Sequence, residues 1–424
     1  MSERSDAHRR HLVDDVLAWW AANGPDDIHG GVLTCWDNAG TRLVSDHKYT
    51  WSQGRWAWLT ARVAVAAEQG LLDVDAGWFR EQSARTAEFV RDHALFSDGT
   101  TAFVTTRSGE PFEATAGAGL HTSVFADLFA ALGFAGVAPL RPDEGWGELA
   151  EEMLVRSACA IESGRFRSDP YPVPAGHLSF GLPMILVGVG EQVHRATGSA
   201  AAAAIVRDAA GEIEEHFLDG DDIVEMPATG NGDPDGLLTR HRTPGHVLEA
   251  LWFLHHARDL LPGSELAQPS RLAGIALHAL DLGWDDAYGG LLRYVDRDGG
   301  APAGARSDDP YERLVVDTWD TKLWWPNAEA LYSTALLAEA AAEPRLAEWH
   351  ARLRDYTVGT FPEGPGREWT QIRNRDGSPL EKTVALPVKD PFHIARALLM
   401  LVELDTKPGR EALGHGTGEE EGAR

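Results

Sequence analysis

The sequence predicts an all-α protein, an (α/α)6 barrel of inner and outer helices with short β-hairpins in its loops. One observation is that stretches rich in helix formers carry apolar residues three and four positions apart. These stretches cover residues 51–69, 181–198, 246–261 and 328–343. The other is a recurring signal of glycines, a few apolar residues and a turn, which starts at His29, Asp98, Glu162, Asp219, Ala287 and Arg367. Six units of two helices and a hairpin describe a closed ring of repeats.

The first and fifth copies of this turn signal match most closely. The first reads HGGVLTCWDNAG from His29, and the fifth reads AYGGLLRYVDRDG from Ala287. In both, an aspartate follows the first glycine of a pair by seven residues, and another glycine follows that aspartate by three. Turn residues between short apolar runs favour small hairpins or extended loops. The repeat therefore supplies the predicted connections between the helices.

We expect the helices to form one domain over residues 1–406, because no linker-like composition divides this part of the chain. The remaining residues, 407–424, are polar, glycine-bearing and acidic. Such a composition cannot bury enough apolar surface to fold, so it predicts a disordered acidic tail.

Composition and charge exclude several functions. The 424 residues include 38 basic and 65 acidic side chains, a net charge of −27. Nucleic-acid binding needs a basic footprint and an anionic membrane repels an acidic chain, so we expect neither as a partner. Two cysteines are too few for a disulfide framework or a Cys-based zinc site. The charged N-terminus and the lack of a run of about 18 apolar residues predict a cytoplasmic protein.

Three predicted helices begin with polar residues where a core would place apolar ones. Arg55 lies early in KYTWSQGRWAW, where its planar guanidinium suits paired sugar or carbonyl oxygens. His246 follows a Pro-Gly break, and Glu249 shares its helix face and can hydrogen-bond to the imidazole and orient it. His393 also follows a proline at a helix start. Taken singly, Arg55 could be a stacked structural arginine, and each histidine could be a helix cap. Parallel inner helices, however, would bring Arg55, His246 and His393 together at one pocket.

Aromatic residues near these helix starts predict a carbohydrate pocket. In TKLWWPNAEAL, Trp324 and Trp325 offer flat apolar faces for sugar rings, while Lys322 and Glu329 could contact hydroxyls. Trp51 precedes Arg55 on the same predicted helix and is a further candidate for sugar binding. Core packing is the alternative explanation for these tryptophans.

Together these segments resemble the N-acylglucosamine 2-epimerase family, which includes cellobiose 2-epimerases, mannose isomerases and sulfoquinovose isomerases. The matching motifs are KYTWSQGR, PGHVLEALWFL, GWDDAYGGLLRYVDRDG (283–299), KLWWPNAEAL and DPFHIARAL, in order between about residues 10 and 404. The resemblance implies an (α/α)6 barrel that acts at C2 of free sugars without a nicotinamide cofactor or an essential metal. It also implies that Arg55, His246, Glu249 and His393 form the active site. KLWWP and LPMILVGVGEQV look most like the N-acylglucosamine epimerase branch.

The isomerase and cellobiose epimerase branches of that family carry a further histidine in an Asn-x-His context. The matching region here reads GHLSFGLPMILV, which makes His177 a candidate for substrate binding. Because His177 lies some residues earlier than the motif would place it, the substrate stays open.

These residues predict proton transfer next to a sugar carbonyl through an enediolate, with one histidine removing the C2 proton and the other returning one. Return of the proton to C2 gives an epimer, whereas delivery to C1 gives a ketose, so aldose–ketose isomerisation is the first alternative. A second alternative is an α/α-barrel glycoside hydrolase or lyase using clustered acids such as Asp317, Asp320 and Glu329. The third is a sugar-binding protein without catalysis. We expect a small-molecule sugar as the partner, and a homodimer is a further possibility.

Overall fold

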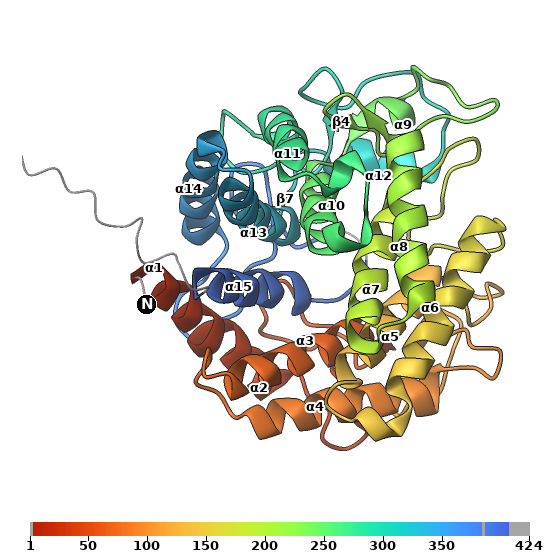
Figure 1. Ribbon diagram of the computed structural model, residues 1–424, viewed down its shortest axis with the longest axis vertical. Helices are drawn as coiled ribbons and strands as arrows, with labels where there is room; N and C mark the ends of the chain where they lie inside the picture. The colour runs from red at the N-terminus through yellow and green to blue at the C-terminus, as the bar shows by residue number, and fades with distance from the viewer. Residues whose placement is uncertain (1–2, 384–385, 407–424) are drawn as a thin grey trace, which may run out of the picture.

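Helices build most of the computed structural model, which describes residues 3–383 and 386–406; the predicted tail 407–424 lies outside the described residues. Within them, six inner helices form a ring (Figure 1). They are α3 (Thr50–Glu68), α5 (Val124–Val137), α7 (Gly181–Thr197), α10 (Pro244–Ala257), α13 (Trp324–Ala340) and α15 (Phe392–Asp405). The outer ring contains α1 (Glu3–Arg10), α2 (Ala18–Asn23), α4 (Ala76–Phe89), α6 (Trp146–Glu162), α8 (Ala200–Glu212), α11 (Pro269–Gly283) and α14 (Pro344–Thr360).

Shorter helical pieces complete these rings. One π-helical segment joins α1 to α2 and two others extend α4 and α8: His11–Leu17, Val90–Ala94 and Ile213–Phe217. Two short α-helices lie in loops, α9 (Leu237–Arg240) and α12 (Pro310–Thr318). Single 3-10 turns cover Pro142–Glu144, Arg258–Leu260 and Glu265–Ala267. Throughout residues 3–383 and 386–406, each helix is too short or too polar to cross a membrane.

The inner ring is closed by helix contacts. In order, α3 packs on α5, α5 on α7, α7 on α10, α10 on α13, α13 on α15, and α15 returns to α3. Each inner helix is covered by an outer one, with α4 on α3, α6 on α5, α8 on α7, α11 on α10, α14 on α13 and α1 on α15. The predicted (α/α)6 barrel is therefore confirmed.

The predicted helices 51–69, 181–198 and 246–261 correspond to α3, α7 and α10. The window 328–343 corresponds to α13, but this helix begins earlier, at Trp324. Pro326 lies in its first turn, where a backbone N–H has no partner inside the helix, so the proline does not break it. The second tryptophan of KLWWP is thereby placed on the helix.

The short strands pair in a way that the sequence did not indicate. Only β3 (Leu218–Asp219) and β4 (Asp222–Ile223), among the strands of the described residues, form a hairpin of neighbours. The other antiparallel pairs join segments far apart: β1 (Lys48–Tyr49) with β2 (Val104–Thr105), β5 (His241–Arg242) with β6 (Val295–Asp296), and β7 (Lys322–Leu323) with β8 (Ile372–Arg373). In register, Lys48 faces Thr105, His241 faces Asp296 and Lys322 faces Arg373. Since β1, β5 and β7 directly precede α3, α10 and α13, this pairing anchors the starts of three inner helices.

A glycine contact sets the spacing between α3 and α5. A Cβ atom added at Gly54 would lie 1.9 Å from the backbone oxygen of Phe129, and one at Gly133 would lie 2.9 Å from the Cα of Gly54. Real atoms cannot approach so closely, so only glycine permits this helix separation. Phe129 is thus held against the N-terminal half of α3, next to Arg55.

Replacing Gly54 with alanine should destabilise the protein by roughly 1–3 kcal/mol or more, because overpacking displaces α5. Gly211 of α8 offers a matched control, since nothing lies within 4 Å of its added Cβ. Gly211→Ala should be neutral or stabilising by about 0.5–1 kcal/mol, as expected of alanine in a helix. Urea unfolding followed by circular dichroism checks both values. Equal stability of the two variants would contradict the close approach of α3 and α5.

Candidate active site

A cavity of about 190 Å³ opens at the N-terminal ends of the inner helices. All six of these helices contribute lining residues from their first two turns, among them Trp51, Arg55, Phe125, Phe129, Met184, Ile185, His246, Glu249, Trp324, Trp325 and His393. Helix N-termini carry partial positive charge, so this end of the barrel favours negative charge on a ligand. Of the predicted site residues, Lys322, Glu329 and His177 do not line the cavity.

His246 is oriented by a carboxylate that sequence reasoning missed. Its Nδ1 lies 2.9 Å from Oε1 of Glu225, a buried residue in the loop between β4 and α9. Burial alone would lower the pKa of His246, but the charge of Glu225 and its hydrogen bond outweigh burial and raise it. With Nδ1–H donated to Glu225, Nε2 is the ring atom that can accept a proton from a ligand.

Glu249 does not orient His246, which corrects the expectation drawn from their three-residue spacing. Its Oε1 instead accepts a hydrogen bond of 2.6 Å from Nη2 of Arg396 on α15. Both residues share a face of α10, but the buried guanidinium of Arg396 offers Glu249 a permanent positive charge and a fixed donor. Glu249 still lines the cavity and adds to the negative charge near His246.

His393 has its own buried carboxylate. Its Nδ1 lies 2.7 Å from Oε1 of Glu329 on α13, while Trp252 donates to Oε2 of the same residue at 2.7 Å. Arg396 donates to Oε1 of Glu329 as well, at 2.6 Å. Burial alone would raise the pKa of Glu329, but the positive charge of Arg396 and the bond with His393 hold it well below its usual range. Glu329, predicted to contact hydroxyls, instead lies behind His393 and fixes its ring.

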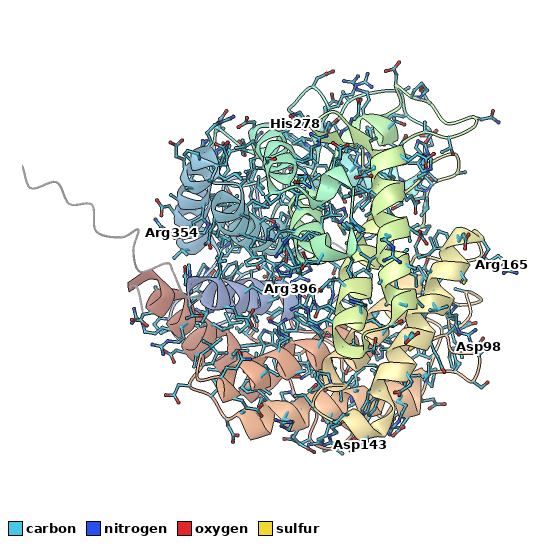
Figure 2. The ribbon with its side chains drawn as sticks, in the orientation of Figure 1. Asp98, Asp143, Arg165, His278, Arg354 and Arg396 are labelled. Atoms are coloured by element: carbon cyan, nitrogen blue, oxygen red, sulfur yellow. The ribbon has the colours of Figure 1, made fainter. Side chains whose placement is uncertain are left out.

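Arg396 occupies the centre of this network. Figure 2 shows it near the middle of the ring of helices, whereas the other labelled side chains lie toward the periphery. It is 3% exposed and joins α15 to Glu249 of α10 and Glu329 of α13. A buried cation held between two carboxylates therefore lies behind Glu249, the one of the two that lines the cavity.

The same carboxylates form the one His, Asp or Glu cluster with metal-like spacing within residues 3–383 and 386–406. It consists of Glu249, Glu329 and His393, whose ligand atoms lie within 4.8 Å of one another. The guanidinium of Arg396 already donates to the Oε1 atoms of both glutamates, and a divalent ion would have to displace it. The donor set therefore fits an internal cation better than a bound metal.

Arg55 is linked through Asp390 to the start of α15, the helix that carries His393. Its guanidinium stacks over Phe129, Trp51 and Phe392, with 4.1, 4.9 and 5.0 Å to the ring centroids, and its Nη1 lies 3.7 Å from Oδ1 of Asp390. Burial lowers the pKa of Arg55 to about 10, with Asp390 acting against this shift, so the side chain stays cationic near neutral pH. Asp390 also accepts hydrogen bonds from the backbone N–H of His393 and from Nε1 of Trp324.

Trp325 brings the two histidines together. Its ring centroid lies 5.1 Å from that of His246 and 6.0 Å from that of His393. A Cβ atom at Gly245 would lie 2.6 Å from this tryptophan ring, so glycine before His246 lets α10 approach α13. Both imidazoles, each bound to a carboxylate through Nδ1, therefore contact the ring of Trp325 inside one cavity.

Lys322 serves the scaffold, which corrects the prediction that it contacts the sugar. Its Nζ is fully buried, pairs with Oδ2 of Asp285 at 3.0 Å and donates to the carbonyl of Gly290 at 3.1 Å. Arg375 binds the same carboxylate through two hydrogen bonds of 2.8 and 3.0 Å. The ammonium group is used to hold the glycine turn of the fifth repeat copy.

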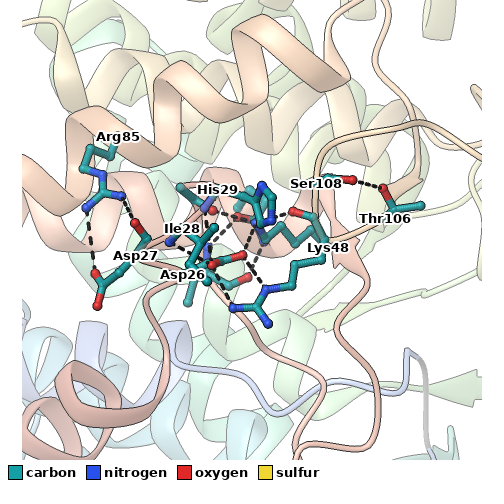
Figure 3. Close-up of polar contacts among 12 residues, drawn as sticks. Asp26, Asp27, Ile28, His29, Lys48, Arg85, Thr106 and Ser108 are labelled. Carbon is teal, nitrogen blue, oxygen red and sulfur yellow. Dashed lines mark hydrogen bonds and ion pairs between the residues drawn. The ribbon is translucent and has the colours of Figure 1, made fainter.

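The first repeat copy is built in the same way. Nζ of Lys48 pairs with Asp26 at 2.9 Å, and Figure 3 shows these two labelled residues side by side. The same Nζ donates to the carbonyl of Gly30 at 2.6 Å. Arg107 binds Asp26 through two hydrogen bonds of 2.9 and 3.0 Å. The two closely matching turn sequences therefore mark two equivalent structural anchors.

His177 lies outside the cavity, so the structure does not support it as a substrate ligand. Its Nδ1 lies 3.2 Å from the carbonyl oxygen of Ala175, and its backbone pairs with Ala228. Ser179 and Gly181, just after it in the chain, line the cavity instead. The loop turns the histidine away before α7 begins.

Replacing Glu225 with glutamine should lower the pKa of His246, because burial then acts without the opposing carboxylate. Histidine ring resonances followed by NMR as a function of pH give this value directly. Glu403→Gln is a suitable control, since Glu403 pairs with Arg62 near the end of α15. A His246 pKa that is the same in wild type and Glu225→Gln would mean that Glu225 does not govern this imidazole.

Comparison with known proteins agrees with this architecture. The family model of N-acylglucosamine 2-epimerase (GlcNAc 2-epimerase) matches residues 192–397, which include His246, Glu249, Glu329, His393 and Arg396. The N-acylglucosamine 2-epimerase of Homo sapiens is 28% identical over 406 residues, covering 92% of this chain and 88% of the human protein.

Solved structures show the same fold at lower identity. Cellobiose 2-epimerase from Bacillus thermoamylovorans superposes with a TM-score of 0.75 at 15% identity, covering 95% of this chain and 100% of that one. D-mannose isomerase gives a TM-score of 0.73 at 14% identity, with 95% and 98% of the two chains covered. The family model and the sequence relatives confirm the predicted similarity to N-acylglucosamine 2-epimerases, which are isomerase-class enzymes, and the solved structures confirm the fold.

Proposed function

We propose that this protein is a sugar epimerase that acts at C2 of a free, unphosphorylated aldose by proton transfer through an enediolate, most like an N-acylglucosamine 2-epimerase. The observation that carries the proposal is the pair of imidazoles on Trp325, each with a buried carboxylate on Nδ1. A binding protein needs no such pair, whereas removal and return of a proton needs two groups that can be base and acid. The similarity to the human N-acylglucosamine 2-epimerase supports the reaction class.

The reaction begins with the open-chain sugar, whose C2–H lies next to the C1 carbonyl. Nε2 of one histidine takes the C2 proton, and the electron pair of the C–H bond forms the C1–C2 double bond of an enediolate. The other histidine then returns a proton to the opposite face of C2, which restores the carbonyl and gives the epimer. Atoms and charge balance without an oxidant, because the sugar is isomerised rather than oxidised.

Arg55 supplies the positive charge that the enediolate needs. The negative charge develops on the C1 oxygen, and a guanidinium held by three aromatic rings and Asp390 is already in place to receive it. The partial positive charge at the N-termini of the inner helices also stabilises this negative charge. Because these positive charges are in place before the reaction, the site needs little reorganisation when the negative charge develops.

The alternatives differ in how well the geometry supports them. Aldose–ketose isomerisation uses the same residues, with the proton delivered to C1, so the product decides between it and epimerisation. A glycoside hydrolase would need two acids facing one bond. Asp317 and Asp320 line a separate surface cavity with Arg375, and Glu329 is bound to Arg396 and His393. The acids do not converge, so the hydrolase alternative has no geometric support.

The test is a product panel in D2O. N-acetyl-D-mannosamine, D-mannose and D-glucose are incubated separately with the enzyme, and products are identified by chromatography and NMR. We expect an epimer that carries deuterium at C2. Deuterium at C1 of a ketose would establish the isomerase alternative. Conversion of none of these sugars, or a product at equilibrium without solvent deuterium, would contradict the enediolate mechanism.

A further inference from the structure

A buried glutamine outside the active-site cavity joins two of the helix starts that build it. Gln371 lies just before β8, is 2% exposed and does not line the cavity. Its side-chain Nε2 donates to the backbone carbonyl of Asp390 at 2.8 Å, and its Oε1 accepts from the backbone N–H of the same residue at 2.9 Å. Its backbone carbonyl accepts a hydrogen bond of 3.0 Å from the N–H of Trp324, the first residue of α13. Gln371 therefore ties the start of α13 to the segment that leads into α15.

The backbone of Gln371 is also bound by the turn of the first repeat copy. Oδ1 of Asn38 accepts hydrogen bonds from the backbone N–H groups of Gln371 and Ile372, at 2.9 and 3.0 Å. Nδ2 of Asn38 donates to the carbonyl of Ile372 at 2.8 Å. Because Asn38 binds the N–H of Gln371 and Trp324 binds its carbonyl, the glutamine side chain starts from a fixed backbone and is preorganised to hold Asp390.

Asp390 carries this constraint into the cavity, which it lines. Its Oδ2 accepts hydrogen bonds from the backbone N–H of His393 at 3.0 Å and from Nε1 of Trp324 at 3.1 Å, and its Oδ1 lies 3.7 Å from Nη1 of Arg55. Burial alone would raise the pKa of Asp390, but the positive charges of His393 and Arg55 hold it below its usual range. One ionised carboxylate thus contacts both the helix start of a candidate base and the guanidinium that faces the enediolate.

We propose that Gln371 is a positioning residue for the C2 reaction, because its two hydrogen bonds to the backbone of Asp390 set the carboxylate that faces Arg55 and the helix start that carries His393. This inference rests on the proposed function and adds a residue that acts through another one rather than on the sugar. An amide side chain suits this role, since it offers a donor and an acceptor side by side. Without it, a buried N–H and a buried carbonyl would lose their partners, and the segment would move to satisfy them.

Gln371→Met keeps the length of the side chain and removes its donor and acceptor. We expect kcat to fall about 10- to 100-fold with a smaller change in KM, because a small misplacement of catalytic groups by a remote mutation can cost that much. Gln53→Met is the matched control, since Gln53 is also buried and its amide donates to and accepts from the backbone of Val32, both at 2.8 Å. Val32 does not line the cavity, so this variant loses the same two bonds and should keep a kcat close to that of wild type.

A double-mutant cycle shows whether Gln371 acts through Asp390. Asp390→Asn removes the charge that faces Arg55 and should lower kcat by itself. If Gln371 works through this carboxylate, adding Gln371→Met to Asp390→Asn should cost much less than it costs in wild type. Two losses that simply multiply would make Gln371 a structural residue and overturn the inference.

The indole N–H of Trp324 gives a readout that does not depend on turnover. Its NMR resonance, assigned by its loss in Trp324→Phe, should shift in Gln371→Met because the hydrogen bond to Asp390 changes, and should stay in place in Gln53→Met. If wild type converts no sugar, the proposed reaction fails, while the indole resonance still decides whether Gln371 sets Asp390. An unchanged resonance, or an unchanged kcat in folded Gln371→Met, would overturn the assignment.

If Gln371→Met does not fold, Gln371→Glu takes its place, because it keeps the length and an acceptor but loses the donor when ionised. The protonated carboxyl can again donate to the carbonyl of Asp390. The ratio of its kcat to that of wild type should therefore rise as the pH falls. A ratio near one at every pH would contradict the positioning role.

Discussion

The buried ion network of Arg396 with Glu249 and Glu329 is the constraint on which the site depends. It joins three inner helices, α15, α10 and α13, below the cavity. Removing one partner of a buried pair leaves an uncompensated charge, which typically costs about 3–5 kcal/mol. The network also fixes Glu329, and Glu329 in turn fixes the ring of His393. The packing of the barrel and the orientation of one candidate base are therefore set by the same contacts.

Charge is distributed so that each histidine has its own carboxylate. Glu225 reaches His246 from a loop, while Glu329 reaches His393 from within α13. Nδ1 of each imidazole is thereby bound to a carboxylate, which leaves Nε2 as the ring atom for the proposed proton transfer. In the proposed reaction, Arg55 and the helix N-termini supply the positive charge for the enediolate. Glu225 and Glu329 have different surroundings, and this difference gives His246 and His393 a physical basis for different roles.

Periodicity and turn signals predicted the barrel because runs of helix formers with apolar residues three and four positions apart mark the helices, and the turn signal recurs between them. The positions of His246 and His393 in the site could also be predicted, because the prolines before them mark helix N-termini. Glu225 was missed because it lies 21 residues before its partner in a loop, where no periodicity links the two. Lys322 was misassigned because the sequence does not distinguish a buried structural lysine from a lysine that binds a ligand. Lys48 and Lys322 each follow one of the two matching repeat copies and precede an inner helix, and this equivalence was the signal that could have shown the structural role of Lys322.

The central claim is that two imidazoles divide the proton transfer at C2 between them. It is tested most directly by following the loss of deuterium from a C2-deuterated sugar in water with His246→Asn and His393→Asn. We expect that neither variant forms product, and that one of them still exchanges the C2 hydrogen with solvent while the other does not. Near-native turnover by both folded variants would contradict it.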